Sequence, residues 1–170
     1  MPSSLELFKR FPNPHFCETG THRGNGVALA LEAGFEDCRS IELHAGNYEA
    51  CKERFKDDCR VKLYFGDSSK MLSSMISDIS EPITFFLDAH FSGEGTANGT
   101  ALNPIHAELE QIALNPWKAH VIIIDDWRCY GGGASGEKIR AQILAINPAY
   151  QFEELDDCIA RNDILVARIP

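Results

Sequence analysis

Short apolar runs alternate with amphipathic helical stretches along almost the whole chain, and this alternation limits the fold more than any other feature of the sequence. Five strand-like runs are each followed by a stretch with helical periodicity, and two more strand-like runs end the chain with no helix between them. The predicted strands cover residues 15–18, 39–43, 61–65, 82–90, 120–126, 150–155 and 164–169. Strands that alternate with helices predict a mostly parallel sheet covered by helices on both faces. The final pair lacks a crossover, so one of its strands is predicted to be antiparallel.

The stretches between these strands have the spacing of amphipathic helices. Helices are predicted over residues 24–33 and about 45–56, around an apolar stripe at residues 71–79, after Asn103-Pro104, and before Asn147-Pro148. Residues 91–103 form the longest polar stretch and are predicted to be a loop. Because no linker or repeat divides the chain, we expect one α/β domain over residues 1–170.

The composition is that of an ordinary water-soluble domain and excludes several classes of partner. The formal net charge is −9, which repels phosphate backbones, so no nucleic-acid partner is expected. No apolar run approaches the roughly 20 residues that cross a bilayer, and the N-terminus lacks the apolar core of a signal peptide. A cytoplasmic location is the resulting expectation. The six cysteines have no CxxC spacing and are predicted to be small buried residues that stay reduced; a zinc or disulfide framework is the alternative.

Every one of the first five predicted strands has an acidic residue at or near its end. Glu18, Glu42, Asp67 and Asp88 follow the first four, and the pair Asp125-Asp126 follows the fifth. Ligands of open α/β sheets bind beyond the carboxyl ends of the strands. Five acids in corresponding positions therefore indicate a ligand site more than solvated loop charges.

The stretch CETGTHRGNG, residues 17–26, follows the first strand and contains Gly20, Gly24 and Gly26. Glycine permits positive φ and lets a ligand approach the backbone closely. The turn lacks the Lys and the spacing of a P-loop, and it reads GxxxGxG where a dinucleotide turn reads GxGxxG. Glu18 precedes the first glycine by two residues and would repel a pyrophosphate, so the turn suits a zwitterionic or cationic ligand.

Together these residues resemble the nucleotide-binding side of class I S-adenosylmethionine (SAM)-dependent methyltransferases. The resemblance rests on Glu18-x-Gly20-x-x-x-Gly24-x-Gly26, then Glu42, then Gly66-Asp67-Ser68. It implies a Rossmann-like, doubly wound sheet of seven strands with an antiparallel C-terminal strand. It also implies that the turn, with Thr21, contacts the methionine part of SAM, Glu42 and Leu43 the ribose, Asp67 and Ser68 the adenine, and that Asp88 borders the cofactor.

A narrower resemblance concerns Asp88, Asp125 and Asp126. Metal-dependent O-methyltransferases of the catechol and macrocin types have an acid after strand four and an Asp-Asp or Asp-Asn pair after strand five. The resemblance implies that these three side chains bind Mg²⁺, which prefers oxygen ligands, with Asp88 as a catalytic residue. His90 follows Asp88 by two residues, as a catalytic base or a ligand would; the alternative is a half-buried loop histidine. Two alternatives remain at this point: Asp125-Asp126 caps a loop or helix, and Asp88 orients the substrate without metal.

The acceptor is the least constrained part of the prediction. Only about 14 residues precede the first strand, whereas metal-dependent relatives usually have extra helices there. The segment that covers the acceptor must therefore come from residues 91–103, from residues 127–136, or from a partner subunit of a homo-oligomer. Trp127 and Tyr130 either stack on an acceptor or pack inside the protein.

The sequence therefore predicts SAM-dependent O-methylation of a small hydroxylated molecule, with Mg²⁺ as a candidate cofactor. The alternatives are metal-independent methylation of nitrogen or of a macromolecule, and a SAM-binding protein without turnover. A nicotinamide-dependent dehydrogenase is disfavoured by Glu18.

Overall fold

The computed structural model describes residues 5–88, 103–131, 133–157 and 160–170, and its centre is one seven-stranded sheet. The strands are β1 (His15–Thr19), β2 (Asp37–Glu42), β3 (Val61–Phe65), β4 (Ile83–Leu87), β5 (Val121–Ile124), β6 (Gln151–Leu155) and β7 (Ile164–Arg168). The helices are α1 (Leu5–Arg10), α2 (Asn25–Ala33), α3 (Ala45–Arg54), α4 (Ser68–Met75), α5 (Ile105–Ile112) and α6 (Ala134–Ile146), with a short 3-10 turn at Trp127–Cys129.

The sheet has the predicted mixture of parallel and antiparallel strands. Its order is β3-β2-β1-β4-β5-β7-β6, and β1 to β5 are parallel to one another. The last strand, β7, is inserted between β5 and β6 and is antiparallel to both. The predicted fold class is therefore confirmed, including the antiparallel strand at the C-terminus.

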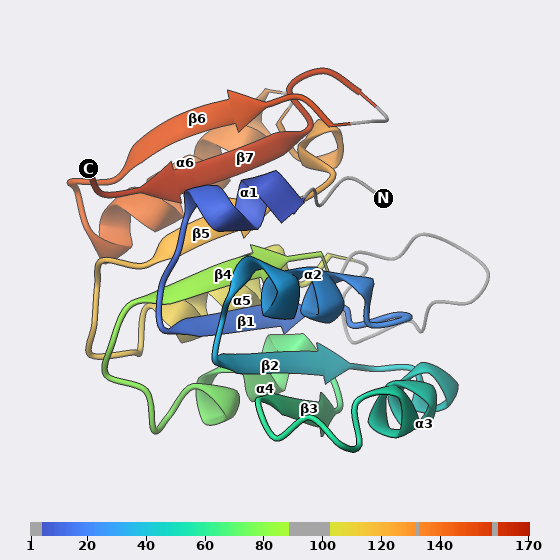
Figure 1. The fold of residues 1–170 in the computed structure, drawn as a ribbon. Helices are drawn as coiled ribbons and strands as arrows, with labels where there is room; N and C mark the ends of the chain where they lie inside the picture. The colour runs from blue at the N-terminus through green and yellow to red at the C-terminus, as the bar shows by residue number, and fades with distance from the viewer. Residues whose placement is uncertain (1–4, 89–102, 132, 158–159) are drawn as a thin grey trace.

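Helices cover both faces of the sheet, as the alternation predicted. In Figure 1, α1 and α2 lie in front of the sheet, and α4, α5 and α6 lie behind it. The front layer buries Phe8, Phe16 and Val27, whereas the back layer buries larger numbers of aliphatic side chains from α4, α5 and α6. All five residues of β4 are buried, because this central strand has helices on both sides.

The strands predicted over residues 82–90 and 120–126 are shorter and end at Leu87 and Ile124, and two helices also differ from the sequence prediction. The helix α1 was not predicted, because six residues are too few for a clear helical period; Phe8 anchors it with an edge-to-face contact to Phe16. The helix predicted around residues 71–79 begins earlier, at Ser68, because the side chain of Asp67 accepts a hydrogen bond from the Ser69 amide and caps it.

The cysteines only partly follow their prediction. Cys17, Cys38 and Cys51 are buried and free, but Cys59 and Cys129 are free and exposed, since they lie in turns outside the sheet. Cys158 lies outside the described residues. In the described part of the chain, no helix combines the length and the apolar character that crossing a membrane requires.

Arg39 connects the amino end of the sheet to the helix behind it. Its side chain is almost fully buried in β2 and donates to the Met75 carbonyl at 2.6 Å and to Asp78 at 2.5 and 3.0 Å. A further bond joins its Nε to Asp37 at 3.0 Å. Burial alone would raise the pKa of Asp37, but hydrogen bonds from Arg39, Lys62 and His15 lower it to about 2.

Replacing Arg39 with Leu should lower the free energy of unfolding by about 2–4 kcal/mol, because the Met75 carbonyl and Asp37 lose a buried partner. Urea denaturation measures the change. The control is Lys52→Met, which removes an exposed ion pair with Glu49 and should change stability by less than about 0.5 kcal/mol. Equal effects of the two substitutions would contradict a structural role for Arg39.

Candidate active site

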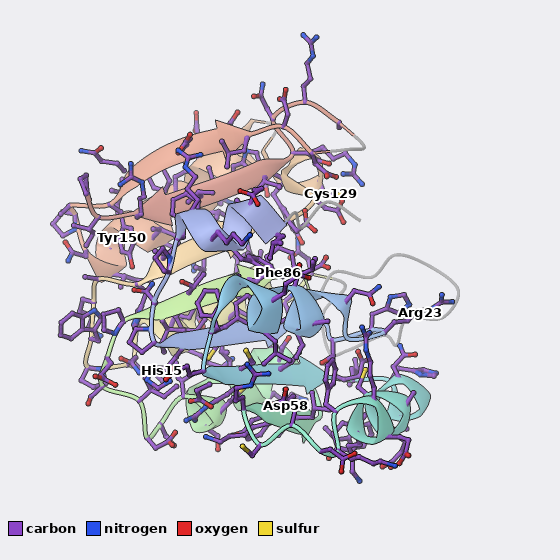
Figure 2. All side chains as sticks on the ribbon, viewed as in Figure 1. His15, Arg23, Asp58, Phe86, Cys129 and Tyr150 are labelled. Carbon is purple, nitrogen blue, oxygen red and sulfur yellow. The ribbon has the colours of Figure 1, made fainter. Side chains whose placement is uncertain are left out.

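The five parallel strands end at one edge of the sheet, and the predicted acids lie along this edge. Thr19 of β1 is aligned with Ile41 of β2 and with Leu87 of β4, and Leu87 is aligned with Ile124 of β5. In Figure 2, Arg23 and Cys129 lie at this right-hand edge, whereas His15 and Tyr150 lie at the opposite one. The order of the strands therefore places Asp67, Glu42, Glu18, Asp88 and Asp125 in that sequence along the edge.

The glycine turn wraps around the end of β2. The amides of Gly20 and Thr21 donate to the Ile41 carbonyl at 3.0 and 3.2 Å. Gly20 and Gly24 have positive φ of 85° and 75°, and a Cβ on Gly24 would lie 2.6 Å from the Phe55 ring. Glycine is thus required here for the conformation and for packing, and it leaves the backbone without side chains at the edge.

Glu18 lies buried against the start of α2. Its Oε2 accepts a hydrogen bond from the Ser40 hydroxyl at 2.7 Å, and a Cβ on Gly26 would overlap its Oε1. Burial raises the pKa of Glu18 to about 8, and the charges of Asp88 and Glu42 add to the increase although the Ser40 bond opposes it. No Lys, Arg or His of the described residues forms an ion pair with Glu18, so a cationic ligand would relieve its desolvation.

Glu42, at the end of β2, has one backbone partner for each carboxylate oxygen. Oε2 accepts from the His22 amide and Oε1 from the His44 amide, both at 2.6 Å. His22 has a positive φ of 49°, which is uncommon for a residue other than glycine. His44 is exposed and caps α3 through its Nδ1, so its described contacts are those of a loop residue. Leu43, which stands between Glu42 and His44 in the chain, is half-buried.

Asp67 and Ser68 form the junction between β3 and α4. The Asp67 carboxylate accepts from the Ser69 amide at 3.0 Å and from its hydroxyl at 2.6 Å. Ser68 is buried, and its carbonyl accepts from the Gln111 side chain at 2.9 Å. The junction is therefore held in place by α5, although it comes from β3.

Asp88 and Asp125 follow the neighbouring strands β4 and β5. The Asp88 amide donates to the Thr19 carbonyl and the Asp125 amide to the Leu87 carbonyl, both at 3.2 Å. Burial raises the pKa of Asp125 to about 8, and the charge of Asp88 is the next cause. These two carboxylates are therefore close enough to interact.

Asp126 differs from its neighbour, because it pairs with Arg128 at 2.6 Å. Arg128 also pairs with the buried Asp163, which precedes β7. Across the ranges described, no three His, Cys, Asp or Glu side chains form a group that could bind a metal ion. Asp126 therefore already has a cation beside it, and Asp88 and Asp125 are acids whose chemistry suits Mg²⁺; the metal set of three carboxylates stays a prediction.

Other predicted residues have a clear place or lie outside the described chain. Trp127 and Tyr130 are buried in the back core, and the indole of Trp127 donates to Glu154 at 3.1 Å, so both are packing residues. His90 and most of the predicted covering loop, residues 91–102, lie outside the described residues.

Sequence reasoning missed two residues at this edge. Ser40 forms hydrogen bonds with both Glu18 and Thr21, but a serine in the middle of a strand gives no sequence signal of such contacts. Glu108 is buried in α5. It lies on the apolar side of that helix, one residue before Leu109, and this place in the helical pattern was a signal of its burial.

Comparisons with known proteins support the fold. No protein-family model and no curated protein match the sequence. Solved structures do match. An O-methyltransferase from Bacillus cereus in complex with S-adenosylhomocysteine (SAH) is 14% identical, with a TM-score of 0.70 over 98% of this chain and 78% of that one. The SAH-bound methyltransferase PaMTH1 of Podospora anserina is 17% identical, with a TM-score of 0.65 over 98% and 76%.

A third match has a different activity. The spermidine synthase of Thermotoga maritima is 12% identical, with a TM-score of 0.65 over 98% of this chain and 56% of that one. At these identities the likeness establishes the fold. The chain therefore has the fold of class I SAM-dependent methyltransferases, as its motifs predicted.

The protein without ligand should gain stability when Glu18 is replaced with Gln. The unfolded chain ionises this carboxyl near pH 4.5, but the folded chain keeps the proton until about pH 8, so the free energy of unfolding falls as the pH rises through this interval. We expect Glu18→Gln to raise the melting temperature at pH 8 by about 4 °C or more, and to change it little at pH 4.5.

Thermal denaturation monitored by circular dichroism measures this difference. Glu32→Gln, an exposed change in the adjoining α2, is the matched control and should behave like the wild type at both pH values. A Glu18→Gln variant that is less stable than the wild type at pH 8 would show that the carboxylate stabilises the fold.

Proposed function

We propose that the protein binds SAM along the carboxyl edge of its sheet and transfers the methyl group to an oxygen of a small hydroxylated acceptor. The observation that supports this most is the buried carboxyl of Glu18 beside a side-chain-free turn, with no cation of the described residues paired to it. SAM has a positive sulfonium and a positive ammonium group, which such a site would stabilise.

The order of the strands matches the order of the chemical groups in SAM. Adenine, ribose and methionine would lie at Asp67 on β3, Glu42 on β2 and Glu18 on β1. The methyl group would then face β4 and β5, where Asp88 and Asp125 lie. A ligand whose chemical groups follow another order would not place each group beside the corresponding acid.

Each residue has a specific part in the proposed reaction. The turn lets the methionine part approach the backbone, Glu18 binds its ammonium group, and the Glu42 oxygens have lone pairs left to accept from the ribose hydroxyls. Bound SAM supplies an activated methyl group. Asp88 accepts a hydrogen bond from the acceptor hydroxyl and aligns its oxygen with the methyl carbon, and positioning of this kind accounts for much of the rate of a displacement.

The proposal also includes a Mg²⁺ ion beside the acceptor. Asp88 and Asp125 would bind it with water molecules, since Mg²⁺ commonly takes only one or two carboxylates in a protein. When bound, the ion would make the acceptor hydroxyl more acidic. Asp126 would not be a ligand while it pairs with Arg128.

Other functions of this fold make different predictions. Metal-independent methylation of nitrogen or of a macromolecule would leave Asp88 as an orienting acid, and a binding protein would bind SAM without turnover. The spermidine synthase among the structural neighbours means that the fold alone does not fix the group that is transferred. A small-molecule acceptor and a cytoplasmic location belong to the proposal, and a nucleic acid or a membrane does not.

Titration calorimetry with SAM and with SAH tests the binding. We expect both to bind, and we expect Glu42→Gln to weaken SAM about 10- to 100-fold, because a charge-assisted bond to the ribose becomes a neutral one. Glu49→Gln, an exposed change in α3, should leave the affinity unchanged. If neither nucleoside binds to the wild type and NAD(H) does, the chain is a dehydrogenase instead.

Chelation tests the metal. With a panel of hydroxylated acceptors, EDTA should lower turnover at least about tenfold and added Mg²⁺ should restore it. Asp125→Asn should abolish the Mg²⁺ response, whereas Asp126→Asn should keep it, since Asp126 pairs with Arg128. Turnover that is indifferent to EDTA would remove the metal and support Asp88 as an orienting acid.

A further inference from the structure

Glu108 is a buried carboxyl that the proposed reaction does not use. It lies in the first turn of α5 and is 1% exposed. Its Oε1 has no hydrogen-bond partner, and no Lys, Arg or His of the described chain forms an ion pair with it. The hydroxyls of Ser68 and Thr19 interact with this carboxyl, but no cation of the described residues balances a charge on it. A buried carboxyl in this state destabilises a protein, so its presence needs a reason beyond packing.

The surroundings of Glu108 place it at the ligand edge. Burial raises its pKa to about 7; the nearby hydroxyls of Ser68 and Thr19 favour the ionised form, and the charges of Asp67 and Asp88 oppose it. Ser68 begins α4, Thr19 ends β1, and Asp88 follows β4. The carboxyl therefore lies on the α4–α5 side of this edge. Along the edge it lies between the end of β3, which would bind adenine, and the end of β4, which the methyl group would face.

Glu108 and Glu18 approach this edge from opposite layers. Glu18 lies against α2, in the front layer, whereas Glu108 comes from α5, in the back layer (Figure 1). A ligand that lies across the ends of β1 and β4 would thus have a buried carboxyl on each side. Two negative charges in a poorly solvated site attract a positive group between them much more strongly than they would in water.

We propose that Glu108 makes the site selective for the charged sulfonium of SAM over the neutral thioether of SAH. This inference rests on the proposed function. When the methyl group leaves, the carbon–sulfur bond breaks with both electrons on sulfur, and the sulfonium becomes a neutral thioether. The acceptor oxygen forms the new bond to the methyl carbon and passes its proton to Asp88, which accepts its hydrogen bond. The attraction between Glu108 and the sulfonium is thereby lost, so release of the product is favoured.

Calorimetry with SAM and SAH at pH 8.5 tests the inference on three proteins: the wild type, Glu108→Gln and Glu110→Gln. Glu110 is the matched control, because it lies on the exposed side of the same helix and loses the same charge. We expect the wild type to bind SAM at least about fivefold more tightly than SAH. Glu108→Gln should lower the affinity for SAM about 5- to 10-fold and leave that for SAH unchanged, and Glu110→Gln should change neither.

The outcomes separate this inference from the proposed function. Binding of neither nucleoside to the wild type would contradict the function itself. Equal or tighter binding of SAH by the wild type, or equal losses of SAM and SAH affinity in Glu108→Gln, would overturn the selective role of Glu108 and leave the function standing. A Glu108→Leu variant shows whether the packing of α5 matters, since it should reproduce the SAM-specific loss if charge is the cause.

Discussion

Desolvation of carboxyl groups at one edge of the sheet is the constraint on which the rest of the site depends. Glu18, Glu108 and Asp125 all have a pKa that burial raises well above that of a carboxyl in water. Each therefore opposes folding near neutral pH, and the well-packed layers on both sides of the sheet must offset it. No cation of the described residues pairs with these three groups, which supports the proposal that a ligand supplies the positive charge.

The opposite edge shows what the same residue type does when it has partners. Asp37 begins β2 and pairs with Arg39, Lys62 and His15, so its pKa falls to about 2 although it is partly buried. There the carboxylate joins β1, β2 and β3 and has a structural role. The contrast between Asp37 and Glu18 comes from their neighbours, because the two acids lie at opposite ends of adjacent, parallel strands.

Much of the fold and part of the candidate site could be predicted from the sequence, for different physical reasons. The long apolar runs and the acids after them predicted the parallel strands and the edge that they share, because parallel strands of similar length end together. The contacts of Glu108 at this edge and the pairing of Arg128 with Asp163 could not be predicted, since both depend on contacts between segments distant in the sequence: α5 with β1 and α4, and the end of β5 with the residue before β7. The buried position of Trp127 has the same origin.

The pairing of Arg128 also explains why the two halves of the edge differ. In the half proposed to bind the nucleoside, Glu18, Glu42 and Asp67 are held by Ser40, by backbone amides and by Ser69, all of which belong to the first three βα units. In the half proposed to bind the acceptor, Asp126 is bound through Arg128 to Asp163, which leads into β7. The inserted strand thus fixes the segment that follows β5. Under the proposed function, changes in the C-terminal hairpin would alter the acceptor side and leave the nucleoside side intact, which is one way for a fold to serve different acceptors.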